Sequence, residues 1–182
     1  MVFGYDPDAA PFSDSEIASI YLDEDVFGKR LDELNECTYV LIGGTDADWL
    51  FTLRRADIIA RMAEIVRSRG KKPVLICHYA STVLPEADRM NLDVEAYFAP
   101  INKSWAWFDL ESAKSAVRHA KKPVIAFMAF ACGALAGGLQ EACDFLKQEC
   151  GVYGVLFGTT KVKNAYNTSK MLLDTFGRNI SE

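Results

Sequence analysis

The chain has 182 residues, half of them hydrophobic and a quarter charged, and its formal net charge is −5. This ordinary globular composition excludes a disordered tail, a collagen-like fibre and a small disulfide-bonded knot. The mildly acidic balance argues against a protein that binds nucleic acid through the phosphate backbone, because such a protein carries a basic excess.

The N-terminal sequence has neither the basic region nor the apolar core of a secretory signal, and no run of about 18 apolar residues predicts a membrane span. We therefore expect a cytoplasmic protein that has no membrane partner. The five cysteines include no CxxC pair and the chain has two histidines, so zinc-ligand spacing is absent and we predict no metal site. We interpret the cysteines as reduced thiols of the core.

Residues 1–36 are expected to form an N-terminal arm with two short helices, followed by an α/β domain over residues 37–182. The first residues are rich in Asp, Pro, Ser and Ala, a composition typical of an extended arm. The short helices are predicted over Glu16–Leu22 and Val26–Asn35.

From Cys37 onward, apolar runs typical of buried parallel strands alternate with segments of helical periodicity. The predicted strands are Thr38–Ile42, Val74–Cys77, Val94–Ile101, Val124–Phe130 and Val152–Phe157. The predicted helices are Asp46–Arg69, Leu110–Ala120, Leu135–Glu149 and Ala165–Phe176. This alternation requires parallel pairing through right-handed crossovers, so the predicted fold class is α/β. Periodicity does not decide between a barrel and an open sheet.

Three segments resemble the later half of a TIM-type (β/α)8 barrel, and the resemblance is to aldo-keto-reductase-like barrel proteins. The segments are GKKPVLICHYAS (Gly70–Ser81), VEAYFAPINK (Val94–Lys103) and KKPVIAFMAFACGAL…YGVLFGTTKVKNAYNTSKML. The first is similar to a strand that ends in a histidine, and the last looks like the family's seventh and eighth strand regions. The resemblance implies parallel strands in a partial or atypical TIM-barrel-like fold.

The chain departs from that family at two points. It has five predicted strands rather than eight, and so lacks the first half of the barrel, which supplies the family's usual catalytic Asp, Tyr and Lys. Where related barrels place Lys before a Gly-rich turn, this chain has Met128, whose thioether cannot orient a tyrosine or form a Schiff base. The resemblance therefore implies no inherited redox chemistry, and the cofactor is unknown.

Five strands in an open arrangement leave two hydrophobic sheet edges exposed. We expect residues 1–36 or a second copy of the chain to cover them, so a homodimer is predicted.

Ligands of parallel α/β proteins bind beyond the carboxyl ends of the strands, and small, polar or reactive residues follow every predicted strand here. We predict that a ligand contacts Gly44, Asp48, Asn102, Lys103, Gly133, Gly158, Thr159, Thr160 and Lys161.

His78 is the candidate catalytic acid/base, with Asp46 or Asp48 as the carboxylate that orients it. Of the two, we assign Asp46 the catalytic role of orienting His78 or polarising the substrate. A histidine hydrogen-bonded in a pocket wall is the alternative. Cys77 and His78 point to opposite faces of the sheet and form no catalytic pair. Cys132 is a nucleophile only if it lies at a helix N-terminus, and we interpret Cys77 and Cys132 as buried, inert thiols.

The segment Gly158–Lys161 comes directly before the last predicted helix and is a candidate phosphate site. Backbone N–H groups at a helix start, with hydroxyls and a lysine beside them, suit a phosphate, and barrels commonly bind phosphate after their last two strands. Gly133 fits the other half of such a cradle. A plain turn between strand and helix is the alternative.

Aromatic residues crowd the predicted loop Asn102–Leu110, which contains Trp105, Trp107 and Phe108. Such a loop serves as a lid, as an aromatic wall for a planar ligand or as a subunit contact. A loop packed under the core is the alternative.

The sequence as a whole predicts a barrel-like protein that binds a small anionic or phosphorylated ligand, with His78 as acid/base if it is an enzyme. Two alternatives stay open. The chain is either a non-catalytic interaction or regulatory protein on a degenerate barrel scaffold, or a half-barrel subunit that a partner completes.

Overall fold

The computed structural model describes residues 12–177, and its centre is a single sheet of five parallel strands. The strands lie in chain order, each beside the next. They are β1 (Tyr39–Gly43), β2 (Lys72–Ile76), β3 (Tyr97–Pro100), β4 (Val124–Phe127) and β5 (Gly154–Val155). Helices alternate with the strands, so the predicted α/β class and the parallel pairing are confirmed.

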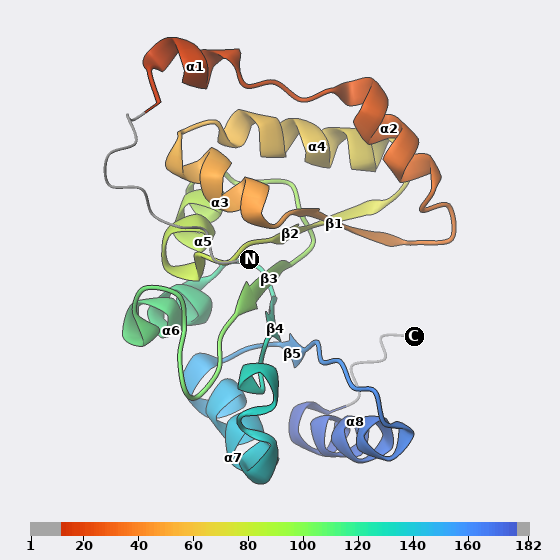
Figure 1. Cartoon of the computed structure of the whole chain (residues 1–182), viewed down its shortest axis with the longest axis vertical. Helices are drawn as coiled ribbons and strands as arrows, with labels where there is room; N and C mark the ends of the chain where they lie inside the picture. The colour runs from red at the N-terminus through yellow and green to blue at the C-terminus, as the bar shows by residue number, and fades with distance from the viewer. Residues whose placement is uncertain (1–11, 178–182) are drawn as a thin grey trace.

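The connecting helices lie along one side of the sheet, as Figure 1 shows. They are α3 (Thr45–Thr52), α4 (Ala56–Ser68), α5 (Ala80–Arg89), α6 (Leu110–His119) and α7 (Leu139–Asp144). This arrangement follows from strand order, because right-handed crossovers between consecutive neighbouring strands always return over the same face. After β5 the chain forms α8 (Val162–Phe176), which contacts α7.

The two faces of the sheet have different surroundings. The face toward the helices, which we call the covered face, carries apolar side chains that are all buried. They are Val40, Ile42, Leu75, Cys77, Tyr97, Ala99, Val124 and Ala126.

The opposite face, which we call the open face, carries the side chains that alternate with these. It consists of Tyr39, Leu41, Val74, Ile76, Phe98, Ile125 and Phe127. Tyr39 is 54% exposed and Leu41 is 44% exposed, and a hollow of about 380 Å³ lies over the part of this face where the strands begin. Parallel sheets are normally buried on both faces, so the open face is unusual for this class.

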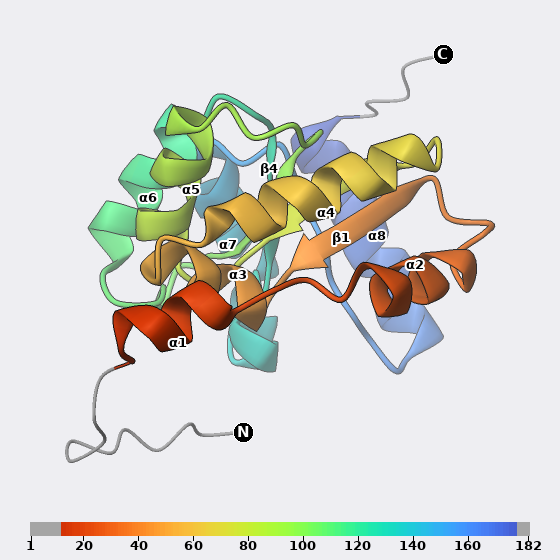
Figure 2. The same cartoon turned by 90° about the horizontal axis from the view of Figure 1, so that it is seen from above.

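The described part of the N-terminal segment packs on the helix layer. It contains α1 (Asp14–Ser19) and α2 (Glu24–Asp32), and in Figure 2 the segment between them runs past α3, with α2 beside β1. Arg55 donates to the carbonyl oxygens of Ile17 at 2.7 Å and Ile20 at 2.8 Å, and Arg61 forms an ion pair with Glu24. Within residues 12–177, no strand pairs with the outer edge of β1 or β5.

Three helix predictions need correction. The helix predicted over Asp46–Arg69 is two helices, because Arg54 adopts a φ of +58° that ends α3 before α4 begins. Helix α5 was not predicted; it contains Pro85, a residue that helix interiors usually exclude.

The predicted helix Leu135–Glu149 is the third correction. It is irregular, because short 3-10 turns at Ala131–Gly133 (η1) and Ala136–Gly138 (η2) precede α7, and π-helical turns over Phe145–Cys150 (η3) follow it. Among residues 12–177, no helix has the length and apolarity that a membrane crossing requires.

Candidate functional site

The turn between β1 and α3 requires two glycines and sets the position of α3. Gly43 has a φ of +102°, and a Cβ atom there would lie 2.6 Å from the Cβ of Ala47 and 2.8 Å from the carbonyl oxygen of Ile76. Gly44 has a φ of +73°, and its N–H donates to the same Ile76 carbonyl at 2.7 Å. Residues with a side chain rarely adopt such φ values, so the turn depends on the two glycines. Because Gly43 has no Cβ atom, the start of α3 can lie directly against the end of β2.

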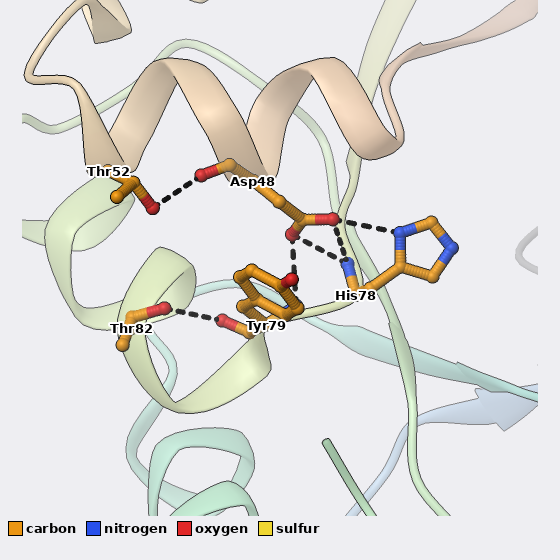
Figure 3. A network of polar contacts seen from close by, with 5 residues as sticks. All are labelled: Asp48, Thr52, His78, Tyr79 and Thr82. Carbon is orange, nitrogen blue, oxygen red and sulfur yellow. Dashed lines mark hydrogen bonds and ion pairs between the residues drawn. The ribbon is translucent and has the colours of Figure 1, made fainter. Parts of the chain in front are cut away.

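Asp48, in the first turns of α3, holds the segment that follows β2. Its buried carboxylate accepts the backbone N–H of His78 at 2.8 and 3.1 Å and that of Tyr79 at 2.9 Å. The same carboxylate lies 2.8 Å from Nδ1 of the His78 ring, as drawn in Figure 3. Backbone and side chain of His78 are therefore both fixed by one aspartate.

This contact assigns the chemical roles of the two imidazole nitrogens. An ionised carboxylate only accepts hydrogen bonds, so Nδ1 carries the proton that Asp48 receives. In the neutral ring, Nε2 is then the free acceptor. His78 thus presents a basic nitrogen at the carboxyl end of β2.

Asp48 also affects the neighbouring thiol. Burial, and to a smaller extent the Asp48 carboxylate, raises the pKa of Cys77 well above its usual range. A buried thiol with a raised pKa stays protonated and unreactive. Cys77 is therefore an inert core residue, as predicted.

Two aromatic rings pack near the His78 ring, and two further rings continue the contact away from it. The Phe127 ring, at the end of β4, lies 5.8 Å from the imidazole centroid, and the Trp107 ring lies 6.3 Å from it, both nearly perpendicular. Tyr79 packs against Trp107 at 6.0 Å and against Phe108 at 4.6 Å. We call these five side chains the aromatic row.

The loop that carries Trp107 and Phe108 is anchored by a buried amide. Asn102 is fully buried; its Oδ1 accepts the N–H groups of Ser104 and Trp105, both at 3.0 Å, and its Nδ2 donates to the Met128 carbonyl at 3.2 Å. The side chain thereby ties the loop after β3 to the loop after β4. Its polar atoms are engaged in these contacts, which leaves its predicted ligand role without direct support.

The structure brings Asp48 to His78 and does not bring Asp46 there. Asp46 is exposed and lines an apolar groove of about 620 Å³ between the N-terminal segment and α3 and α4. Residues two apart on a helix point to nearly opposite sides, so only one of the two aspartates can face β2. The orienting role that the sequence analysis assigned to Asp46 belongs, by geometry, to Asp48.

The remaining predicted ligand residues lie elsewhere at the same edge of the sheet or beyond it. Lys103 forms an ion pair of 2.6 Å with Glu141 of α7, and Gly133 is exposed in η1. Gly158–Lys161 is exposed, and the Lys161 N–H donates to Thr159 Oγ1 at 3.3 Å. Figures 1 and 2 show that this segment leads to α8, on the opposite side of the molecule from α3. The phosphate site there stays a prediction.

The cysteines divide into two groups. Cys77, Cys143 and Cys150 are buried, and burial raises the pKa of the Cys150 thiol to about 12. Cys37 and Cys132 are exposed. The prediction of a buried Cys132 is wrong, because Cys132 lies in the irregular turn η1 with a φ of +55° and is exposed there.

Sequence reasoning missed Tyr79 and Phe127 as neighbours of His78, and it assigned the orienting role to Asp46 although the structure places Asp48 there. The available signal was the helix that follows Gly43-Gly44, since its register decides which aspartate faces inward. In residues 12–177 no three His, Cys, Asp or Glu side chains gather in a way that would hold a metal ion. A scan against protein-family models finds none that matches this chain, and a search of curated proteins finds no relative.

Proposed function

We propose that the protein binds a small anionic molecule at the carboxyl end of β2 and that His78 acts on it as an acid/base. The observation that carries this proposal is the contact of 2.8 Å between His78 Nδ1 and the buried Asp48 carboxylate. A histidine with one nitrogen held by a buried carboxylate and the other free is suited to proton transfer.

The proposed chemistry assigns a role to each residue. Neutral His78 accepts a proton from the ligand at Nε2, and the ring becomes a cation. The Asp48 carboxylate stabilises that cation and keeps the ring in one orientation. The protonated ring then favours an anionic group, to which it returns the proton.

We further propose that the sheet corresponds to part of a (β/α)8 barrel similar to aldo-keto-reductase-like proteins. Strands in chain order with helices on one side are what such a barrel contains. Met128 follows β4 directly, so the proposal extends to the scaffold and not to the family's redox chemistry.

Self-association is the third part of the proposal, because the open face and the β1 edge need a cover. The Lys72 N–H donates to the Thr38 carbonyl, and the Gly44 N–H donates to the Ile76 carbonyl. Because the direction alternates along a strand, the N–H and C=O groups of Tyr39, Leu41 and Gly43 point away from β2, toward the free edge of the sheet. A two-fold axis at Leu41 would pair Tyr39 with Gly43 of a second copy, and both leucines would meet on the open face.

Titration with methyl phosphate, followed through backbone amide shifts, tests the ligand site. We expect saturable shifts at Asp48, His78 and Tyr79. They should disappear in His78→Gln and persist in His119→Gln, a matched control because His119 lies at the end of α6 with its ring against the Ser115 carbonyl. Shifts confined to Gly158–Lys161 would move the ligand to that segment, and no saturable shift would refute the proposal.

Sedimentation equilibrium at several concentrations tests self-association. We expect a dimer that Leu41→Lys converts to a monomer, since two like charges would then face each other across the two-fold axis. A wild-type protein that is monomeric at every concentration would contradict the proposed self-association.

A further inference from the structure

The aromatic row reaches beyond what an acid/base pair needs. Only Trp107 and Phe127 lie beside the His78 ring, whereas Tyr79 and Phe108 continue the row away from it. Trp107 is 45% exposed and Phe108 is 72% exposed, so the ring beside the imidazole and the outer ring of the row both stand partly in solvent. The row therefore ends in aromatic surface that solvent reaches.

The loop presents these rings at a structural cost. Phe108 has a φ of +67°, a region that bulky side chains rarely adopt. Glycine or asparagine would fit this backbone with less strain, and either would also remove the exposed ring. Strain and exposure at one residue beside a candidate site are the kind of outlier that points to a functional role.

The loop is also held in place rather than loose. Asn102 ties it to the loop after β4, a bridge between Ile101 and Ala106 narrows its base, and the Asp109 side chain caps α6 directly after Phe108. The two rings are therefore fixed relative to His78. Preorganised aromatic surfaces bind flat rings with little loss of conformational freedom.

From these observations we infer that the molecule on which His78 acts carries a flat, preferably aromatic ring, which packs on Trp107 and Phe108 while its anionic group faces His78. This inference rests on the proposed function and adds the class of substrate. It assigns Trp107 and Phe108 to specificity, and neither residue takes part in proton transfer.

A matched pair of probes tests the inference, because phenyl phosphate and methyl phosphate differ in the ring and share the phosphate group. We expect phenyl phosphate to bind about two- to tenfold more tightly, the range that one aromatic contact contributes. Binding is followed through the amide shifts of His78 and Tyr79, so that the readout reports the site itself.

Two variants remove the rings separately. Phe108→Gly suits the positive φ and should fold as the wild type does, and Trp107→Ala removes the ring nearest to His78. Each should lower the ratio of the affinities for phenyl phosphate and methyl phosphate, whereas a variant that only disturbs His78 should weaken both probes by the same factor. Tyr166→Ala is the control, because Tyr166 is an exposed aromatic residue of α8 that lies outside the site.

The possible outcomes separate the inference from the proposed function. Equal binding of the two probes at His78 would overturn the inference and leave the proposed function standing. A preference for phenyl phosphate that survives in both ring variants would also overturn it, since the ring would then bind elsewhere. If neither probe shifts His78, the proposed function itself fails.

Discussion

The two faces of the sheet are built from similar residues and have different surroundings. Leu75 and Leu41 lie on neighbouring strands; Leu75 points into the covered face and is fully buried, whereas Leu41 points from the open face and is 44% exposed. The covered face holds the fold together, because apolar burial is the main favourable contribution to folding. The open face contributes less to the single chain, and His78 and Phe127 stand at its carboxyl end. The comparison teaches that the less covered face of the sheet is also the face at whose end His78, the proposed acid/base, lies.

The largest expected loss of stability comes from removing a buried side chain of the covered face. Leu75→Ala should lower the free energy of unfolding by about 2–5 kcal/mol, because it removes a fully buried side chain and leaves a cavity. Leu41→Ala, its partner in the comparison, should cost the monomer less than about 1 kcal/mol. Urea unfolding at low protein concentration measures both. Equal losses would show that the open face is packed in the single chain.

The next loss of stability is expected from a change in the turn that joins β1 to α3. Gly43→Ala should lower the free energy of unfolding by about 1–3 kcal/mol, because the φ is positive and the new methyl group meets Ala47 and the Ile76 carbonyl. Gly158→Ala is the matched control, since nothing lies within 4 Å of a Cβ atom there. If both variants unfolded at the same denaturant concentration, the close approach of α3 to β2 would be wrong.

A change of similar size should follow from altering Asp48, the aspartate of α3 that holds His78. Asp48→Asn removes the negative charge and turns one acceptor into a donor facing N–H groups, which should cost about 1–3 kcal/mol. Asp46→Asn should be nearly neutral, because Asp46 is exposed. Thermal unfolding of the two variants compares them directly. A larger loss in Asp46→Asn would reverse the assignment of the orienting carboxylate.

The reaction rates of the cysteines test the same comparison without any substitution, because they report which parts of the fold are closed to solvent. At pH 8, a thiol reagent should modify Cys37 and Cys132 quickly, since both are exposed. Cys77, Cys143 and Cys150 should react far more slowly, because burial blocks access and raises their pKa values, so that little thiolate is present. Peptide mass spectrometry over time gives the rates. Fast modification of Cys77 would indicate that the covered face opens.

Much of the fold could be predicted from the sequence, because continuous apolar runs mark strands that are buried in a parallel sheet. The strand Val94–Ile101 was placed correctly but shortens to Tyr97–Pro100. The break at Arg54 was not predictable, because α3 and α4 continue one apolar pattern on the same side of the sheet. The proline in α5 likewise masked a helix that tertiary packing stabilises.

The candidate site was predicted in part, for a related reason. His78 follows an apolar run, so its place at a strand end could be inferred. The choice of Asp48 over Asp46 depends on where α3 begins, which the close packing of Gly43 against Ala47 sets. The aromatic row joins residues from three strand ends, and such long-range contacts leave no local pattern in the sequence.

The most direct test of the account is nitrogen NMR of the His78 ring, with and without methyl phosphate. The chain has two histidines, so each ring signal can be assigned by comparison with His119→Gln. The account predicts that Nδ1 carries a proton in the free protein, and that the Nε2 signal changes saturably when methyl phosphate is added. An Nδ1 that carries no proton in the free protein, or an Nε2 signal that methyl phosphate does not change, would contradict it.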